Sequence, residues 1–147
     1  MLRYSPLAFK VRGGDTTSAG QIPYIVSLQS HTREHPHFCG ASIIHPLILL
    51  TAAHCLMGMN KPDGIIAVSG KHQLSVHERS QQSRNISRFV IHENWDTKTV
   101  ENDIALLILD HPFEFNRYTR QIRIPTADSI LSSKKQLERM QCLPSYK

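Results

Sequence analysis

The sequence contains no uninterrupted apolar run of about eighteen residues, the length that a helix needs to cross a bilayer. The chain is therefore predicted not to span a membrane. Residues 1–10 are also too short and too interrupted to hold the apolar core of a signal peptide.

The sequence also lacks any concentration of positive charge. The formal net charge is +5 and the sequence pI is near 9.3, a balance that permits binding to polyanions. The basic side chains are scattered, however, and their densest cluster is a short run around Lys134–Lys135. Nucleic-acid recognition needs a basic stripe or a recognisable module. We therefore predict a solvated basic surface and no nucleic-acid partner.

Cysteine is scarce, and its count of three is odd, so one cysteine has no partner within this chain. Three cysteines alone do not decide between an oxidising and a reducing compartment. Asn85-Ile86-Ser87 is an N-glycosylation sequon, which is compatible with secretion and makes Asn85 a candidate glycosylation site. The composition, 40% hydrophobic and 20% charged, is that of an ordinary globular domain. The length indicates one domain, with or without a tail.

From Gln21 onward the sequence has the texture of a β protein. Several short segments alternate apolar and polar residues, as half-buried strands do, and turn-forming residues separate them. The expected strands are 23–30, 37–44, 46–50, 65–70, 84–92, 103–109 and 121–125. Such a series predicts a sandwich or a barrel, and periodicity alone does not distinguish the two.

One histidine stands out from the nine in the chain. Residues 49–55, Leu-Leu-Thr-Ala-Ala-His-Cys, predict the end of a buried strand and a small-residue turn that presents His54. A histidine near its ordinary pKa can take and return a proton at physiological pH. A carboxylate, Asp103, begins another apolar strand in Asn-Asp-Ile-Ala-Leu-Leu, residues 102–107. The two motifs together favour a proton-transfer site over a histidine that merely packs in a turn.

Four motifs, in their order and spacing, resemble the first half of a trypsin-like (chymotrypsin-fold) serine protease. They are Lys10-Val11-Arg12-Gly13-Gly14, Phe38-Cys39-Gly40-Ala41-Ser42, Thr51-Ala52-Ala53-His54-Cys55 and Asn102-Asp103-Ile104-Ala105-Leu106-Leu107. The resemblance implies an all-β fold with a single six-stranded antiparallel β-barrel, which is one half of the two-barrel trypsin-like fold.

The resemblance also suggests how the chain divides. Residues 1–10 are expected to be a pro-segment or an exposed tail, and residues 11–125 the barrel. Residues 126–147 resemble nothing in the family and are expected to form an irregular or helical tail. Cys142, in that tail, is the cysteine left without a partner.

By the same resemblance, His54 is the general base and Asp103 is the carboxylate that orients it. Cys39 and Cys55 are expected to form a disulfide, which persists in an oxidising, extracellular setting. The partner is then a polypeptide substrate or another protein, no cofactor is needed, and the oligomeric state stays open. A secreted protein without a leader suggests that the N-terminus of this sequence is incomplete.

The resemblance also implies a cleavage site. In this family, cutting after a basic residue frees an amine that orders the active site, which here places the cut between Lys10 and Val11. Arg12 departs from the aliphatic residue usual at the second position, and a charged side chain fits poorly in an apolar slot. An exposed tail without regulated cleavage is the alternative.

The third member of the catalytic triad is missing from the pattern. The family places its nucleophilic serine last, in a glycine-rich turn that also forms the oxyanion hole. Here the last glycine is Gly70, and no serine after Asp103 lies between glycines. We therefore expect a chain that is truncated before the nucleophile and is inactive by itself. A non-catalytic homologue that serves as a binding or regulatory module is the alternative.

Two further groups of residues contain side chains that can bind metals. His31, His35 and His37 are close in sequence, but a histidine-bearing surface loop is the better interpretation. The loop 71–83 has one carboxylate, Glu78, too few for a hard cation. No metal is therefore predicted.

Overall fold

The computed structural model describes residues 17–30 and 36–125. These residues form six strands and one short 3-10 helix. The elements are β1 (Ile25–Ser30), β2 (His37–His45), β3 (Ile48–Thr51), η1 (Ala53–Leu56), β4 (Ile65–Ser69), β5 (Gln82–Ile91) and β6 (Ala105–Leu109). Lys10, Val11, His31, His35, Cys142 and the expected tail helix lie outside the described residues.

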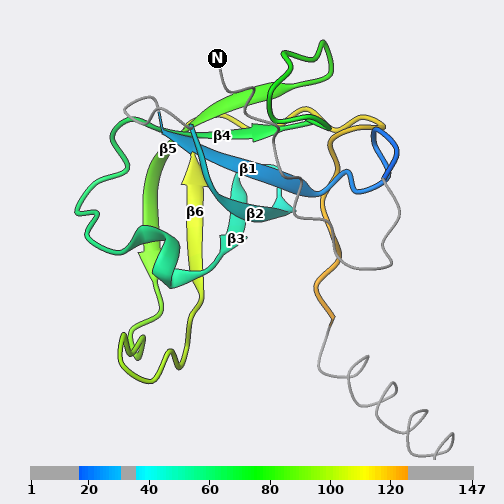
Figure 1. Cartoon of the computed structure of the whole chain (residues 1–147). Coiled ribbons are helices and arrows are strands. Elements are labelled where there is room, and N and C mark those ends of the chain that lie inside the picture. The colour runs from blue at the N-terminus through cyan, green and yellow to red at the C-terminus, as the bar shows by residue number, and fades with distance from the viewer. Residues whose placement is uncertain (1–16, 31–35, 126–147) are drawn as a thin grey trace, which may run out of the picture.

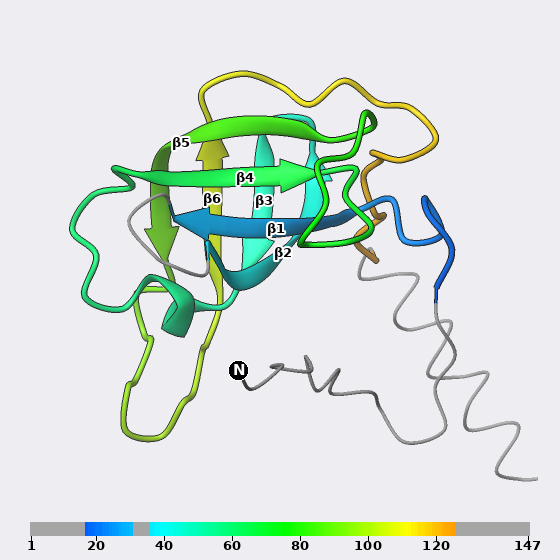
Figure 2. The same cartoon turned by 45° about the horizontal axis from the view of Figure 1, so that its top comes forward.

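The six strands close on themselves. Their order is β1-β2-β3-β6-β5-β4, every pairing is antiparallel, and β4 pairs with β1 to complete the barrel (Figure 1). Figure 2 shows β1 and β4 side by side where the circle closes. The prediction of a six-stranded antiparallel barrel is therefore confirmed. Closure also leaves no strand edge unpaired along the ring.

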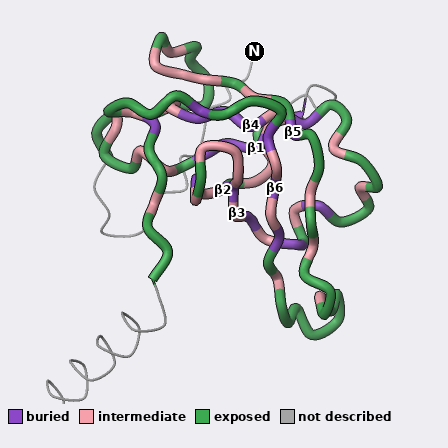
Figure 3. Tube along the Cα trace, turned by 180° about the vertical axis from the view of Figure 1, so that it is seen from behind, coloured by how far each residue is buried: buried purple, intermediate pink, exposed green. Residues whose placement is uncertain are grey.

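Alternation along each strand fills the barrel. On β6, Ala105, Leu107 and Leu109 are buried, whereas the two residues between them are partly exposed. The same inward face on other strands includes Leu28, Ile43, Leu49 and further apolar side chains. Figure 3 shows burial concentrated on the strands and exposure on the loops. Removing this apolar surface from water is what stabilises the barrel.

One predicted strand was wrong. Residues 121–125 form no strand, although Ile122 donates its N–H to the carbonyl of Ile43 at 2.8 Å. Ile43 lies one residue beyond the pairing of β2 with β1, which ends at Ser42, and its own N–H donates to the carbonyl of Tyr24. The segment 121–125 therefore contacts β2 through this one backbone hydrogen bond and otherwise continues as irregular chain.

No helix in the described part of the chain has the length and apolar character needed to cross a bilayer.

Candidate active site

His54 lies in η1, directly after β3. The strand ends at Thr51, whose hydroxyl donates to the carbonyl of Gly40 at 2.8 Å and so fixes the end of β3 against β2. Ala53 is fully buried, because its methyl side chain lets the turn lie close to the barrel core. The next residue is therefore turned outward, and 55% of the His54 side chain is exposed.

A disulfide anchors this turn. Cys39 on β2 and Cys55 in η1 are bonded, with their Cα atoms 6.1 Å apart, as the resemblance implied. The bridge joins the residue next to His54 to the wall of the barrel. The backbone that carries the imidazole is thus fixed at one end by β3 and at the other by a covalent bond.

Asp103 comes from the loop between β5 and β6. This loop is held by its own hydrogen bonds: Asp96 donates its N–H to the Glu101 carbonyl at 3.1 Å, and the Asn102 side chain donates to the Asn94 carbonyl at 2.9 Å. Asn102 has a φ of 57°, a left-handed conformation that asparagine tolerates better than most residues. The chain turns at Asn102, which aims Asp103 at His54 before β6 begins.

His54 and Asp103 make a two-point contact. The Nδ1 atom of His54 lies 2.7 Å from Asp103 Oδ2, and the His54 backbone N–H donates to Asp103 Oδ1 at 2.8 Å. Each carboxylate oxygen therefore has a partner on the same residue. The hydrogen bond from the His54 side chain, followed by that from its backbone, lowers the pKa of Asp103 below its ordinary value. Asp103 is thus a carboxylate at neutral pH.

This contact determines what the imidazole can do. A carboxylate at Nδ1 favours the tautomer that carries its proton there, which leaves Nε2 as the acceptor. Nε2 lies 3.7 Å from Cys55 Sγ. Within the described residues, no hydroxyl group hydrogen-bonds to Nε2. The arrangement therefore supplies an oriented base without a nucleophile beside it.

The same corner brings three metal-ligand residue types together. Ligand atoms of Cys39, His54 and Cys55 lie within 4.8 Å of one another. The two sulfurs are bonded to each other, so neither is the thiolate that a metal such as zinc takes as a ligand. The cluster therefore does not fit a metal site.

The other predicted positions lie away from this corner. His37 is on β2, and its Nδ1 lies 2.8 Å from the hydroxyl of Ser27. In the 71–83 loop, the Lys71 ammonium donates to the Val76 carbonyl, and Glu78 accepts the His72 N–H at 2.5 Å. The ammonium group of Lys71 therefore lies where a cation bound to the Val76 carbonyl would lie.

Asn85 lies on β5 with its side chain exposed. Its amide nitrogen donates to Asp110 Oδ2 at 2.9 Å. Asp110 directly follows β6, whereas Asp103 precedes it. The sequon and the His54–Asp103 pair therefore lie at opposite ends of β6.

Sequence reasoning missed two supports of the site. The Thr51–Gly40 hydrogen bond joins residues eleven positions apart, and no local pattern indicates such a pairing. The left-handed turn at Asn102 had a signal in the sequence, since asparagine is enriched in that conformation. The prediction from the motif at residues 102–107 used only its aspartate.

Comparison with known proteins supports one class. A family model described as Trypsin matches residues 11–140. Trypsin-1 of Astacus astacus is 37% identical over 116 residues, which cover 77% of this chain and 49% of that protein. Coagulation factor IX of Cavia porcellus is 36% identical over 118 residues, covering 79% and 39%. Trypsin of Sus scrofa is 34% identical over 116 residues, covering 79% and 46%.

The closed six-stranded barrel, with a histidine–aspartate pair at one end, agrees with these comparisons. The chain belongs to the trypsin family, and it corresponds to the N-terminal portion of a trypsin-like domain. It spans about half the length, or less, of these three relatives.

Proposed function

We propose that this chain supplies the general base and its orienting carboxylate to a secreted trypsin-like serine endopeptidase, which cleaves peptide bonds by acyl transfer. The observation that carries the proposal is the two-point contact between His54 and Asp103. A single hydrogen bond would leave the imidazole free to rotate, whereas the added backbone contact fixes the carboxylate relative to the ring.

The proposed chemistry follows from this geometry. Nε2 of His54 takes the proton of a serine hydroxyl as the serine attacks the peptide carbonyl, and then gives it to the leaving amine. Asp103 holds the tautomer and stabilises the imidazolium that forms in between. The serine and the oxyanion-hole N–H groups belong to a glycine-rich turn that these 147 residues do not contain. We therefore expect the 147-residue polypeptide to be inactive as a single chain.

The disulfide supports an extracellular location, where it would persist. Cleavage between Lys10 and Val11 remains our proposed activation step, and both residues lie outside the described part of the structure.

Labelling with a fluorophosphonate probe tests this proposal. The purified chain is exposed to the probe before and after limited trypsin cleavage, alongside His54→Ala and Asp103→Asn. We expect no labelling above the His54→Ala control, together with a cooperative thermal melt. Labelling that depends on His54 would show that a serine in this chain is activated and would overturn the expected inactivity.

A complementation experiment tests the catalytic role itself. The chain is co-expressed with the C-terminal half of a trypsin-family domain as a separate polypeptide, and peptide hydrolysis is measured. If His54 and Asp103 act as proposed, Asp103→Asn lowers kcat by about 10⁴, the known size for this triad. Hydrolysis that is insensitive to both substitutions would contradict the assigned roles.

A second candidate function is that of a protein-binding module. A groove of about 370 Å³ beside β1 is lined by apolar residues that include Ile22, Ile25 and Leu74. Ile25 and Leu74 are 50% and 56% exposed, and the gathering of such apolar side chains in one groove favours a protein contact. The second barrel of a trypsin-like domain is the occupant we propose. Capture of that half by the His54→Ala chain, without hydrolysis, would support binding independently of catalysis.

A further inference from the structure

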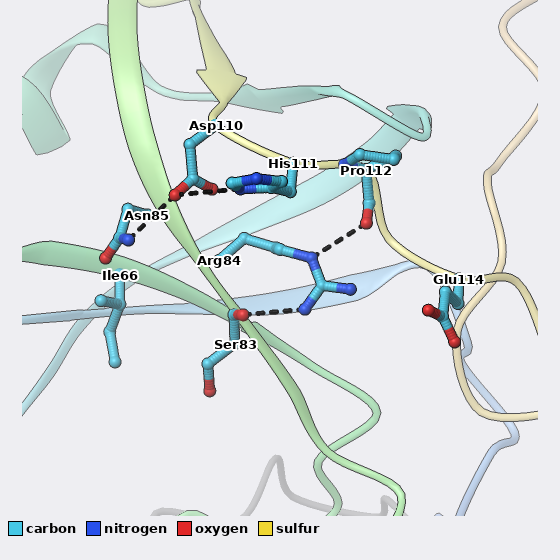
Figure 4. A pocket seen from close by; sticks show the side chains of 8 residues that line it. All are labelled: Ile66, Ser83, Arg84, Asn85, Asp110, His111, Pro112 and Glu114. Atoms are coloured by element: carbon cyan, nitrogen blue, oxygen red, sulfur yellow. Dashed lines mark hydrogen bonds and ion pairs between the residues drawn. The ribbon is translucent and has the colours of Figure 1, made fainter.

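A second hollow lies at the far end of β6 from His54. It has a volume of about 590 Å³ and is bounded by β4, β5 and the segment 110–114 that follows β6 (Figure 4). None of its lining residues belongs to the His54–Asp103 site. The hollow is thus a separate feature of the barrel wall, and its polar groups indicate what it can hold.

The one arginine that lines the hollow donates three hydrogen bonds. Arg84 donates from Nε to the Pro112 carbonyl at 2.9 Å, from Nη1 to the Ser83 carbonyl at 2.9 Å and from Nη2 to Gln82 Oε1 at 3.2 Å. Its guanidinium also lies over the Phe113 ring, 5.4 Å from the centroid. These contacts hold the Arg84 side chain in place across the hollow and use three of its five N–H donors.

Two of the remaining polar lining residues, Asp110 and Glu114, are carboxylates, which only accept hydrogen bonds when ionised. Asp110 accepts the Asn85 amide, and it lies 3.4 Å from His111 Nδ1. In the part of the chain that the structure describes, no hydrogen bond involves the Glu114 carboxylate. Ile66, which pairs with Asn85 across β4 and β5, adds an apolar surface. A ligand with several hydroxyl donors and one apolar face fits this lining.

Asn85 connects this hollow with a covalent modification. It begins the sequon Asn85-Ile86-Ser87, and its side chain points into the hollow toward Asp110 (Figure 4). Ile86 pairs with Leu109 and Arg88 with Ile108, so Ser87 is the extra residue of a bulge and is exposed. The amide nitrogen has two hydrogens. One can be retained for Asp110 while a sugar replaces the other.

We propose that Asn85 carries an N-linked glycan and that the hollow seats its first N-acetylglucosamine. The C–H face of the pyranose packs on Ile66, and a hydroxyl group donates to the carboxylate of Asp110. Attachment requires an oligosaccharide activated as its pyrophosphate. The Asn85 nitrogen forms a bond to the anomeric carbon, the bond from that carbon to the phosphate oxygen breaks, and the nitrogen loses one proton as the pyrophosphate leaves. This proposal depends on secretion but not on catalysis by the chain.

The first test asks whether the sugar is present. The 147-residue chain is secreted from glycosylating eukaryotic cells and its mass is measured with and without enzymatic deglycosylation. We expect a glycan on Asn85, and none in Ser87→Ala, which removes the sequon and leaves the hollow intact. A secreted, folded chain without sugar on Asn85 would overturn the proposal.

The second test asks whether the sugar is seated. Release of the glycan by a peptide-N-glycosidase is timed on native and on denatured protein. Seating predicts native release at least about tenfold slower than denatured release, with most of that protection lost in Ile66→Ser or Asp110→Ala. Val90→Ser, at an exposed apolar position on β5 that does not line the hollow, is the control and should keep the protection.

Asp110→Ala keeps this test decisive, because Asp110 is an exposed residue after the end of β6 and its truncation leaves the barrel core untouched. A cooperative melt of each variant shows that it is folded. Native release as fast as denatured release from folded parent protein would mean that the sugar projects into solvent, and the seat would be rejected.

Discussion

The two ends of β6 each carry an aspartate beside a histidine, and the two pairs differ in how they are held. At the start of the strand, His54 Nδ1 lies 2.7 Å from Asp103 Oδ2, and the His54 backbone N–H binds the other oxygen. At the end of the strand, His111 Nδ1 lies 3.4 Å from Asp110 Oδ2. His54 lies 49 positions from its aspartate, whereas His111 is the next residue after its own.

The exposed fractions of the side chains also differ between the two pairs. His54 and Asp103 have 55% and 23% of their side chains exposed, against 78% and 28% for His111 and Asp110. Asp110 and His111 are adjacent in sequence and can be in contact in any fold. Their contact therefore costs little conformational freedom and does little to orient either side chain. The contact between His54 and Asp103 depends on β3, η1, the disulfide and the turn at Asn102, which together place the two side chains side by side. Orientation of this kind is what a general base requires.

The largest expected effect comes from weakening β6, the strand whose two ends carry the two histidine–aspartate pairs. Leu107 is fully buried at the middle of β6, and Leu107→Ala should lower the free energy of unfolding by about 2–5 kcal/mol through lost burial and the cavity left behind. Urea denaturation measures the change. Ile104→Ala, at an exposed position just before the strand, is the control and should cost roughly 0.5 kcal/mol or less. Equal losses in the two variants would contradict the assigned core.

The disulfide should matter at one end of the strand only. Replacing Cys39 and Cys55 together by alanine should lower the free energy of unfolding by about 3 kcal/mol, because the unfolded chain is no longer restricted. In nuclear magnetic resonance spectra, the shifts of His54 and Asp103 should move while those of Asn85 and Asp110 stay. Cys142→Ala, which leaves the bridge between Cys39 and Cys55 intact, is the control and should change neither set of shifts. Shifts of equal size at both ends would show that the bridge acts on the whole barrel.

A smaller effect tests the Asp110 end. Asn85→Asp places a second carboxylate where the amide now donates to Asp110 at 2.9 Å. Like charges raise the pKa of such a pair, so the variant should lose about 1 kcal/mol at neutral pH and regain stability as the pH falls and one carboxylate is protonated. Thermal melts of Asn85→Asp and Asn85→Gln between pH 4 and 7 measure this difference. A loss that does not change with pH would exclude charge repulsion as its cause.

These contrasts also show what the sequence could predict. The alternation of apolar residues in β1, β5 and β6 was visible, and the motifs around His54 and Asp103 carried the barrel topology through their family resemblance. The irregular path of residues 121–125 was not visible in the sequence, because Gln-Ile-Arg-Ile alternates like a strand, whereas in the barrel it makes one backbone hydrogen bond to β2, from Ile122 to Ile43. The hydrogen bond from Asn85 to Asp110 depends on the register of β5 against β6, which no local pattern reports.

The smallest effect concerns the two carboxylates themselves. The His54 hydrogen bonds lower the pKa of Asp103, so His54→Ala should raise that pKa toward its ordinary value. For Asp110, burial raises the pKa, but hydrogen bonds from Asn85 and then His111 outweigh it and leave the pKa lowered. His111→Ala should therefore raise the pKa of Asp110 less than His54→Ala raises that of Asp103, because Asn85 still donates. Side-chain carboxyl resonances followed during an acid titration measure both values.

The pH dependence of stability gives the same comparison a second readout. A carboxylate whose pKa is lowered by folding stabilises the protein above its unfolded pKa, and that contribution is lost as the pH falls through the lower folded value. The parent chain should thus lose stability below about pH 4, and His54→Ala should lose less of it there than His111→Ala does. If both variants followed one acid curve, the two-point contact at Asp103 would hold its carboxylate no more firmly than the neighbouring histidine holds Asp110.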